Sequence, residues 1–208
     1  MHIAEFRKLP ILGILRGIEA DVVEPLMDTI ASAGLKTIEI TMNTRDAAQL
    51  IRRAAASSKK RLTIGAGTVL NMESLKAALD AGATFIVMPV LVPDVMAYCV
   101  KNRIPAFPGA LTPQEIHLAW HSGAAMVKVF PSNFFGPEYF KELKGPFDDV
   151  ALLACGGVTP QNMKSYFANG VAAVSFGASV FKKEWLVQKD FDSIARSIRA
   201  FVDGFKVL

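Results

Sequence analysis

Short runs of apolar residues alternate with longer amphipathic stretches along the whole chain. Eight of these runs have the length and composition of buried strands, and successive runs begin roughly 20–25 residues apart. This spacing leaves room for one helix and two loops between each strand and the next. The expected strands are residues 11–15, 37–40, 62–67, 85–88, 104–109, 126–130, 150–154 and 172–176.

The stretches between these strands begin and end with residues typical of helix termini. Asn71 is a good N-cap residue, and Thr112 followed by Pro113 fits a helix start with proline in the first turn. Thr159 and Pro160 repeat that pattern. Glycine, which adopts the left-handed conformation that ends many helices, follows four expected helices at positions 34, 82, 123 and 170. The expected helices are residues 2–8, 20–33, 71–81, 112–122, 159–169 and 190–205.

Eight strand–helix units in a row, with no linker or low-complexity segment, predict a parallel sheet covered by helices. Eight is the number of strands that closes a (β/α)₈ TIM barrel, and 208 residues lies at the lower size limit of that fold. We therefore expect a single α/β domain over residues 1–208, a barrel with a short N-terminal helix. A long open sheet is the alternative. In such barrels the functional residues lie at the C-terminal ends of the strands.

Composition narrows the class of protein. Hydrophobic residues make up 51% and charged residues 20% of the chain, which is typical of a globular protein and not of a disordered one. The net charge of +4 is mild and the basic residues are scattered, which argues against nucleic acid as a partner. No apolar run reaches the ~18 residues of a membrane span, and residues 1–10 do not resemble a signal peptide. We expect a soluble cytoplasmic protein.

Lys128 is the most unusual polar residue, because it lies inside the apolar run MVKVF. Its side chain must point either into the barrel or outward among the helices. Burial of an ammonium group is costly, and the neutral amine is a nucleophile for carbonyl groups. The alternative is a structural lysine that extends to the surface or pairs with a carboxylate.

Glu39, inside the apolar run TIEI, is the natural partner of Lys128. A carboxyl group in such a strand exchanges protons near neutral pH if burial raises its pKa. A structural ion pair with Lys128 or Arg16 explains the same residue equally well.

Two glycine-containing turns end the last two expected strands, at Gly156–Gly157 and at residues 177–179. Glycine lets backbone amides approach a phosphate, and Ser179 adds a hydroxyl group. Phosphate sites recur after strands 7 and 8 of this barrel, although glycines also serve tight turns without a ligand.

Other candidate sites are weaker. The two cysteines, Cys99 and Cys155, form no close-spaced pair, which argues against a disulfide framework and against a cysteine-based zinc site. His117 and His121 have the spacing of metal ligands on one helical face. However, their helix is expected on the outside of the barrel, so we interpret them as a partly exposed helix surface.

The strand-end motifs together resemble one family. They are Arg16, Glu39 within IEIT, GAGTVL at 65–70, Pro89, FPG at 107–109, KVFPS at 128–132, GGVTP at 156–160 and GAS at 177–179. The set is similar to the bacterial 2-keto-3-deoxy-6-phosphogluconate (KDPG) aldolases, including their phosphogalactonate and 4-hydroxy-2-oxoglutarate relatives. The resemblance runs from about residue 8 to residue 205, nearly the whole chain.

The resemblance implies a class I aldolase, a lyase that needs no metal or other cofactor and acts on a phosphorylated keto acid. It assigns the Schiff-base nucleophile to Lys128 and the proton shuttle to Glu39. It also implies a homotrimer. Further positions match the pyruvate carboxylate and pyruvyl pocket (Arg16, Thr68, Pro89 and Phe130) and the phosphate site (Gly156, Gly157 and Ser179).

Two positions depart from the most common pattern of that family. Asn43 stands where many phosphogluconate enzymes carry arginine, and Asn is more frequent in the phosphogalactonate branch. Cys155 stands where the two branches tend to carry Thr or Val. These two residues are therefore candidates for setting the choice between epimeric sugar acids.

Two other classes of protein share the glycine turns. One is a phosphate-binding barrel isomerase or synthase of the thiamine-phosphate or tryptophan-pathway kind. The other is a non-catalytic binder of sugar phosphates. Neither requires a buried lysine and glutamate together with the GAGT and KVFPS motifs.

Overall fold

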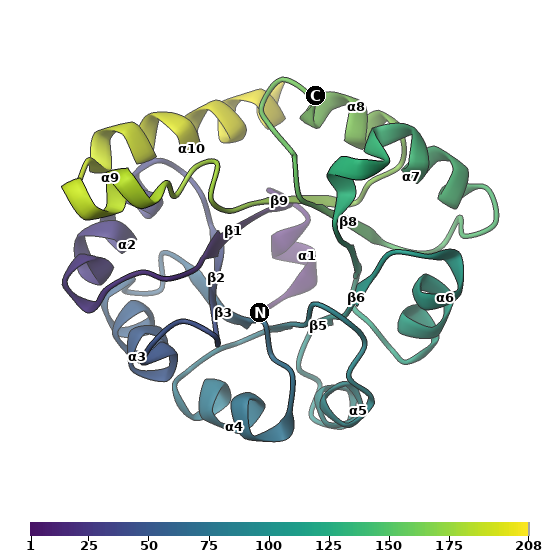
Figure 1. Cartoon of the computed structure of the whole chain (residues 1–208), viewed down its shortest axis with the longest axis horizontal. Coiled ribbons are helices and arrows are strands. Elements are labelled where there is room, and N and C mark those ends of the chain that lie inside the picture. The colour runs from purple at the N-terminus through teal and green to yellow at the C-terminus, as the bar shows by residue number, and fades with distance from the viewer. Residues whose placement is uncertain (208) are drawn as a thin grey trace.

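The first strand, β1 (Ile11–Leu15), pairs in parallel both with β2 (Thr37–Thr41) and with the last strand, β9 (Ala173–Phe176). This pairing joins the two halves of the sheet in the computed structural model, which describes residues 1–207 (Figure 1). On one side the sheet continues from β2 through β3 (Thr63–Gly67) to β4 (Ile86–Val87). On the other side it continues from β9 through β8 (Leu152–Cys155) to β7 (Val127–Val129).

The barrel closes through β5 (Ala106–Phe107) and β6 (Gly109–Ala110), which are separated only by Pro108. β5 pairs with β4 and β6 pairs with β7, so the two pieces are one strand interrupted by a proline. The carbonyl oxygen of Pro108 still accepts a hydrogen bond from the Lys128 amide at 2.9 Å. The (β/α)₈ barrel prediction is confirmed, and the open sheet is excluded.

Helices surround the barrel on its outer side, except for the first, α1, which lies at the barrel centre (Figure 1). Short 3₁₀ turns precede two of them, η1 (Ala20–Val22) before α2 and η2 (Ser132–Phe134) before α7. The helices are α1 (Ile3–Phe6), α2 (Val23–Ser32), α3 (Ala47–Ser57), α4 (Met72–Asp80), α5 (Pro93–Lys101), α6 (Pro113–His121), α7 (Gly136–Lys144), α8 (Met163–Ala168), α9 (Lys183–Gln188) and α10 (Phe191–Lys206).

Most of the predicted helix termini are confirmed. The side chain of Asn71 accepts a hydrogen bond from the Ser74 amide at 2.8 Å, and Thr112 forms a capping box with Glu115. The four glycines expected after helices have φ angles between 85° and 100°, the left-handed conformation that glycine favours.

The predicted start of α8 at Thr159 and Pro160 was too early. Residues 160–162 form a turn instead. The Thr159 amide donates to the Asn162 side chain at 2.8 Å, and the Asn162 amide donates to the Thr159 hydroxyl at 3.2 Å. These reciprocal bonds hold the turn, and the helix begins at Met163.

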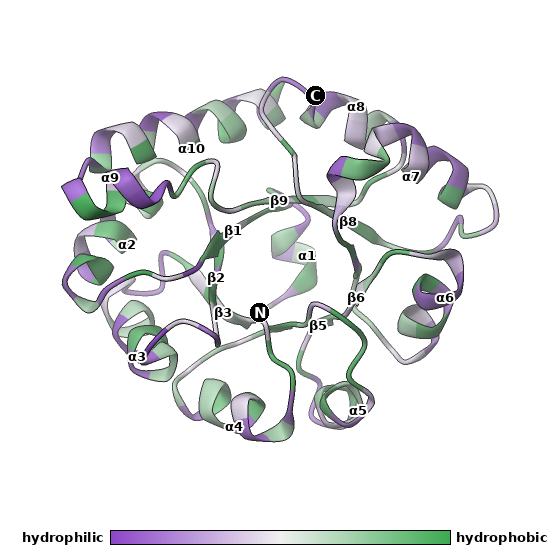
Figure 2. Cartoon of the chain, viewed as in Figure 1, coloured by the Kyte–Doolittle hydropathy of each residue, from purple (hydrophilic) through white to green (hydrophobic). Residues whose placement is uncertain are grey.

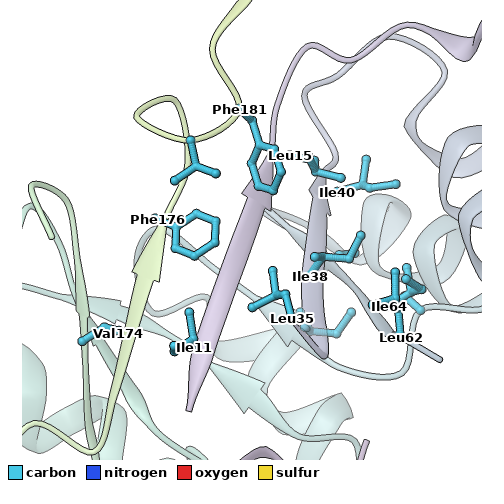
Figure 3. Close-up of a cluster of buried hydrophobic side chains, with 14 of the residues drawn as sticks. Ile11, Leu15, Leu35, Ile38, Ile40, Leu62, Ile64, Val174, Phe176 and Phe181 are labelled. Atoms are coloured by element: carbon cyan, nitrogen blue, oxygen red, sulfur yellow. The ribbon is translucent and has the colours of Figure 1, made fainter. Parts of the chain in front are cut away.

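Apolar side chains form two separate clusters, one on each face of the sheet. The outer cluster packs strand residues such as Ile38, Ile40 and Ile64 against the helices (Figure 3). Figure 2 shows the corresponding pattern, with mainly hydrophobic strands and helices that carry both kinds of residue. The division into two faces follows from the period of two along a strand.

The inner cluster fills the barrel and includes Leu12, Phe85, Phe107, Met126 and Leu153. Helix α1 lies over the barrel centre in Figure 1, and its Phe6 stacks on Phe107 with ring centroids 6.0 Å apart. The barrel interior is therefore packed at its N-terminal end, and polar groups are accommodated nearer the other end. No helix within residues 1–207 is long and apolar enough to cross a bilayer.

Candidate active site

Lys128 is the middle residue of β7, between the fully buried Val127 and Val129. Its register partner on β8 is Leu153, a member of the inner cluster, and Met126 two residues earlier belongs to the same cluster. Because side chains alternate along a strand, Lys128 points into the barrel. Only 7% of the residue is exposed.

Glu39 enters the same interior from β2. Its neighbours Ile38 and Ile40 belong to the outer cluster, so Glu39 faces inward, and only 1% of the residue is exposed. Neither carboxylate oxygen has a hydrogen-bond partner among residues 1–207. Burial raises the pKa of the Glu39 carboxyl group above its ordinary value, although the charges of Lys128 and Arg16 act in the opposite direction.

The alternative role of Glu39, a structural ion pair with Lys128 or Arg16, is not observed among the residues that the structure describes. The ion pairs within residues 1–207 join other side chains, and none contains Glu39, Lys128 or Arg16. A buried carboxyl group with a raised pKa and free oxygens is suited to give and take protons.

Two inward-facing glycines on β3 provide the space for this arrangement. A Cβ atom at Gly67 would overlap with the carboxyl group of Glu39, and one at Gly65 would overlap with the Phe85 ring. Sequence reasoning recognised the GAG segment only as a motif and missed this role. The signal was present, because two glycines two residues apart lie on the same face of a strand.

Arg16 and Thr68, predicted to hold a carboxylate, are brought together at the ends of β1 and β3. The Arg16 Nη2 atom lies 3.4 Å from the Thr68 hydroxyl oxygen. Thr68 has a φ angle of 55°, which is unusual for a β-branched residue and is typical of a constrained functional position. The Gly17 amide donates to the Thr44 hydroxyl at 3.0 Å, which ties the loop that carries Arg16 to the next loop.

Phe130 follows β7, the strand that carries Lys128, and Pro89 lies against the neighbouring strand β6. A Cβ atom at Gly109, the register partner of Lys128 on β6, would overlap with the carbonyl group of Pro89. The loop after β4 therefore packs directly against β6, next to β7. The Phe130 ring centroid lies 5.5 Å from Nζ of Lys128, and 44% of Phe130 is exposed.

The two glycine turns follow β8 and β9, which are neighbours in the barrel. Gly156 and Gly157 have φ angles of 102° and 73°, which other residues rarely adopt. Within residues 1–207 the amides of Gly156, Gly157, Ala178 and Ser179 make no hydrogen bond to another backbone group. Ser179 is exposed. These amides and this hydroxyl group are available to an anion.

The two specificity candidates lie at the same end of the barrel as these turns. Cys155 is the last residue of β8, is 5% exposed and belongs to the inner cluster. Asn43 is exposed in the turn after β2. Cys155 therefore lies between the barrel interior and the Gly156–Gly157 turn.

His117 and His121 lie apart from this site, on the outer helix α6. Both are exposed, and their ring centroids are 4.0 Å apart. Nδ1 of His121 lies 2.9 Å from the His117 carbonyl oxygen. Residues 1–207 contain no cluster of three or more His, Cys, Asp or Glu side chains with the geometry of a metal site.

Two cavities lie near the ends of the strands. One of about 530 Å³ lies beside Arg16, between the loop after β1 and helix α9. Another, of about 1290 Å³, surrounds α1 at the opposite end of the barrel and contains none of the predicted site residues.

Comparison with known proteins identifies the family. Residues 3–197 match the family model described as KDPG and KHG aldolase. The chain is 33% identical over 195 residues to the 2-dehydro-3-deoxy-6-phosphogalactonate aldolase of Escherichia coli, covering 93% of this chain and 95% of the relative. It is 33% identical over 202 residues to the 2-dehydro-3-deoxy-phosphogluconate aldolase of Pseudomonas aeruginosa, covering 97% and 90%.

A solved structure described as "Native KDPGal structure" superposes with a TM-score of 0.89 at 32% sequence identity, covering 96% of this chain and 95% of that one. The family is the one that the strand-end motifs resemble, so that prediction is confirmed. The assignment also decides against the isomerase, synthase and non-catalytic classes that the glycine turns left open. The chain belongs to the KDPG and KHG aldolase family and is a lyase.

Proposed function

We propose that this lyase is a class I aldolase in which Lys128 forms a Schiff base with the 2-keto group of its substrate. The observation that carries the proposal is the pair of inward-facing side chains in the barrel. Lys128 supplies a buried amine, and Glu39 supplies a buried carboxyl group whose oxygens have no partner within residues 1–207. These are the nucleophile and the proton shuttle that imine chemistry requires.

The reaction begins when the neutral Lys128 amine adds to the C2 carbonyl group. Glu39 transfers a proton to the resulting hydroxyl group, water leaves, and an iminium ion forms at C2. The iminium ion withdraws electrons from the C3–C4 bond. The Glu39 carboxylate then accepts the C4 hydroxyl proton, an aldehyde is released, and the C3–C4 electron pair remains as an enamine. Protonation of C3 and hydrolysis release pyruvate and restore the lysine.

The surrounding groups fit the two anionic ends of a phosphorylated keto acid. Arg16 and Thr68 offer a guanidinium group and a hydroxyl group to the C1 carboxylate, and Pro89 and Phe130 line the pyruvyl part. At the other end, Gly156, Gly157 and Ser179 hold the phosphate through backbone amides and a hydroxyl group.

The substrate that this arrangement supports is 2-keto-3-deoxy-6-phosphogluconate or its galactonate epimer, cleaved to pyruvate and glyceraldehyde 3-phosphate. The unphosphorylated 4-hydroxy-2-oxoglutarate, cleaved to pyruvate and glyoxylate, is the further candidate. Cys155 and Asn43 are proposed to set the preference between the epimers. A comparison of kcat/KM on the three substrates, with Cys155→Thr and Cys155→Val variants alongside the wild type, tests this assignment.

Borohydride trapping tests the mechanism directly. Incubation with pyruvate and borohydride is expected to reduce the imine and add a stable mass to the peptide that contains Lys128. Lys128→Ala should lose both the label and turnover, whereas Lys164→Ala, a lysine on α8 outside the site, should keep both. An unlabelled Lys128 peptide in an enzyme that cleaves the substrate would contradict the Schiff-base mechanism.

We further propose, from the family resemblance, that the chain acts as a single domain in a homotrimer located in the cytoplasm. Sedimentation of the purified protein tests the trimer, since a species of one-third the expected mass would contradict it.

A further inference from the structure

We propose that Ser132 is a positioning residue that fixes the Gly156–Gly157 turn relative to the strand that carries Lys128. The inference rests on the proposed function, because it concerns how the nucleophile and the phosphate-binding turn are held at a constant separation.

One buried hydroxyl group connects the two parts of the site. Ser132 is 1% exposed and begins η2, three residues after β7 ends at Val129. Its Oγ donates to the Val129 carbonyl oxygen at 2.8 Å and accepts from the Cys155 amide at 2.9 Å. Val129 is the residue after Lys128, and Cys155 is the residue before Gly156. The hydroxyl group therefore links the residue next to the nucleophile with the residue next to the glycine turn.

This link replaces a sheet hydrogen bond that is absent at this point. The ladder between β7 and β8 ends at the pair Val129 and Ala154, whereas β8 continues to Cys155. The Cys155 amide therefore lies beyond the last backbone pair with β7. Without the Ser132 hydroxyl group this amide would be buried without a partner, which is unfavourable.

Close packing of the same two loops supports the link. A Cβ atom at Gly157 would lie 2.5 Å from Cβ of Asn133, and one at Gly156 would lie 3.4 Å from the Ser132 amide nitrogen. The glycine turn thus rests directly on residues 132–133. Any shift of that segment moves the turn.

A substrate that occupies both ends of the site depends on this separation, whereas pyruvate alone does not. Loss of the Ser132 hydroxyl group should therefore weaken phosphate binding and cleavage of the phosphorylated substrate. It should leave the reaction of Lys128 with pyruvate unchanged. A general loss of fold would instead lower both, so the two effects are separable.

The test compares Ser132→Ala with wild type and with Ser58→Ala. Ser58 is also buried, at 2% exposed, and its hydroxyl group also donates to a carbonyl group, but it lies at the end of α3 away from the site. Three quantities are measured: kcat/KM on the phosphorylated substrate, competitive inhibition by inorganic phosphate, and the rate of borohydride trapping with pyruvate.

For Ser132→Ala we expect kcat/KM to fall about tenfold, the size of effect that follows loss of one buried hydrogen bond, and phosphate inhibition to weaken. Pyruvate trapping should stay at the wild-type rate, and Ser58→Ala should leave all three quantities unchanged. Unchanged kcat/KM and phosphate inhibition, or an equal fall in cleavage and trapping, would overturn the positioning role.

Two controls keep the outcome interpretable. Ser132→Cys preserves the volume of the side chain and replaces the hydroxyl group by a weaker thiol. It provides the same comparison if the alanine variant cannot be purified, and the same selective loss is expected. Wild-type enzyme that neither cleaves the substrate nor traps pyruvate would refute the proposed function itself, whereas normal wild-type chemistry with no selective loss refutes only the role of Ser132.

Discussion

Gly67 provides the space that the Glu39 carboxyl group occupies inside the barrel. The two residues lie on adjacent strands, β3 and β2, and a Cβ atom at position 67 would overlap with the carboxyl group. Glu39 is enclosed on all sides, so its side chain has little freedom to move away. The position of the proposed proton shuttle therefore depends on the absence of a side chain on the neighbouring strand.

We predict that Gly67→Ala displaces Glu39, lowers kcat by at least tenfold and destabilises the protein by about 1–3 kcal/mol, the usual cost of overpacking a core. Turnover assays and urea unfolding measure the two effects. Gly204→Ala is the control, because its added methyl group would meet the end of the Met163 side chain at 3.3 Å and the Pro160 carbonyl oxygen at an ordinary contact distance of 4.0 Å. A Gly67→Ala variant with full activity would show that catalysis does not require the Glu39 carboxyl group to occupy the space beside residue 67.

Glu39→Gln preserves the shape of the side chain and removes its ability to transfer a proton. We expect kcat to fall about 10²–10⁴-fold, the range typical of a lost general acid–base group. Stability should not fall, because the carboxyl group has no hydrogen-bond partner to lose within residues 1–207. Kinetics and chemical unfolding of the same preparation are the measurements. A variant with near wild-type kcat would exclude Glu39 as the shuttle.

The raised pKa of Glu39 predicts a pH-dependent stability. Between its ordinary pKa of 4.5 and the raised value, the folded state binds more protons at this group than the unfolded state does. The contribution of Glu39 to the free energy of unfolding must therefore decrease as pH rises through this window and level off above it. The difference in unfolding free energy between wild type and Glu39→Gln, measured across pH, should follow this course. A constant difference, or one that increases with pH, would contradict the raised pKa.

Arg16→Ala should weaken binding of the carboxylate at the C1 end of the substrate. Loss of a charge-assisted hydrogen bond of about 1.5–3 kcal/mol corresponds to a rise in KM for the substrate of roughly 10–100-fold. Because Arg16 is exposed, stability should change little. Arg45→Ala controls for net charge, because Arg45 is another exposed arginine and lies in the loop between β2 and α3. Equal effects of the two variants would indicate general electrostatics instead of a specific contact.

Treatment with EDTA is expected to leave cleavage unchanged, because the proposed imine chemistry uses only side chains and backbone groups. The activity is measured before and after exhaustive chelation. Loss of activity that a divalent metal restores would point to a different aldolase mechanism.

Local patterns in the sequence predicted much of the fold. Runs of apolar residues gave the eight strand positions, because a parallel barrel buries both faces of each strand. Glycines at helix ends and the Thr112–Pro113 pair marked helix boundaries, because these signals act within one helical turn. The start of α8 was predicted too early because the side chains of Thr159 and Asn162 each accept a hydrogen bond from the other residue's backbone amide. The Thr-Pro pattern does not distinguish this turn from a helix start.

The sequence by itself determined the barrel and singled out Lys128 and Glu39 as charged residues in apolar strands. Only the tertiary structure decided that both side chains point inward, because that direction depends on the register of neighbouring strands. The same holds for Gly67 and Ser132, whose roles arise from contacts with residues 28 and 23 positions away in the chain. Such contacts form only when the barrel closes, so the residue types that make them carry no distinctive local pattern.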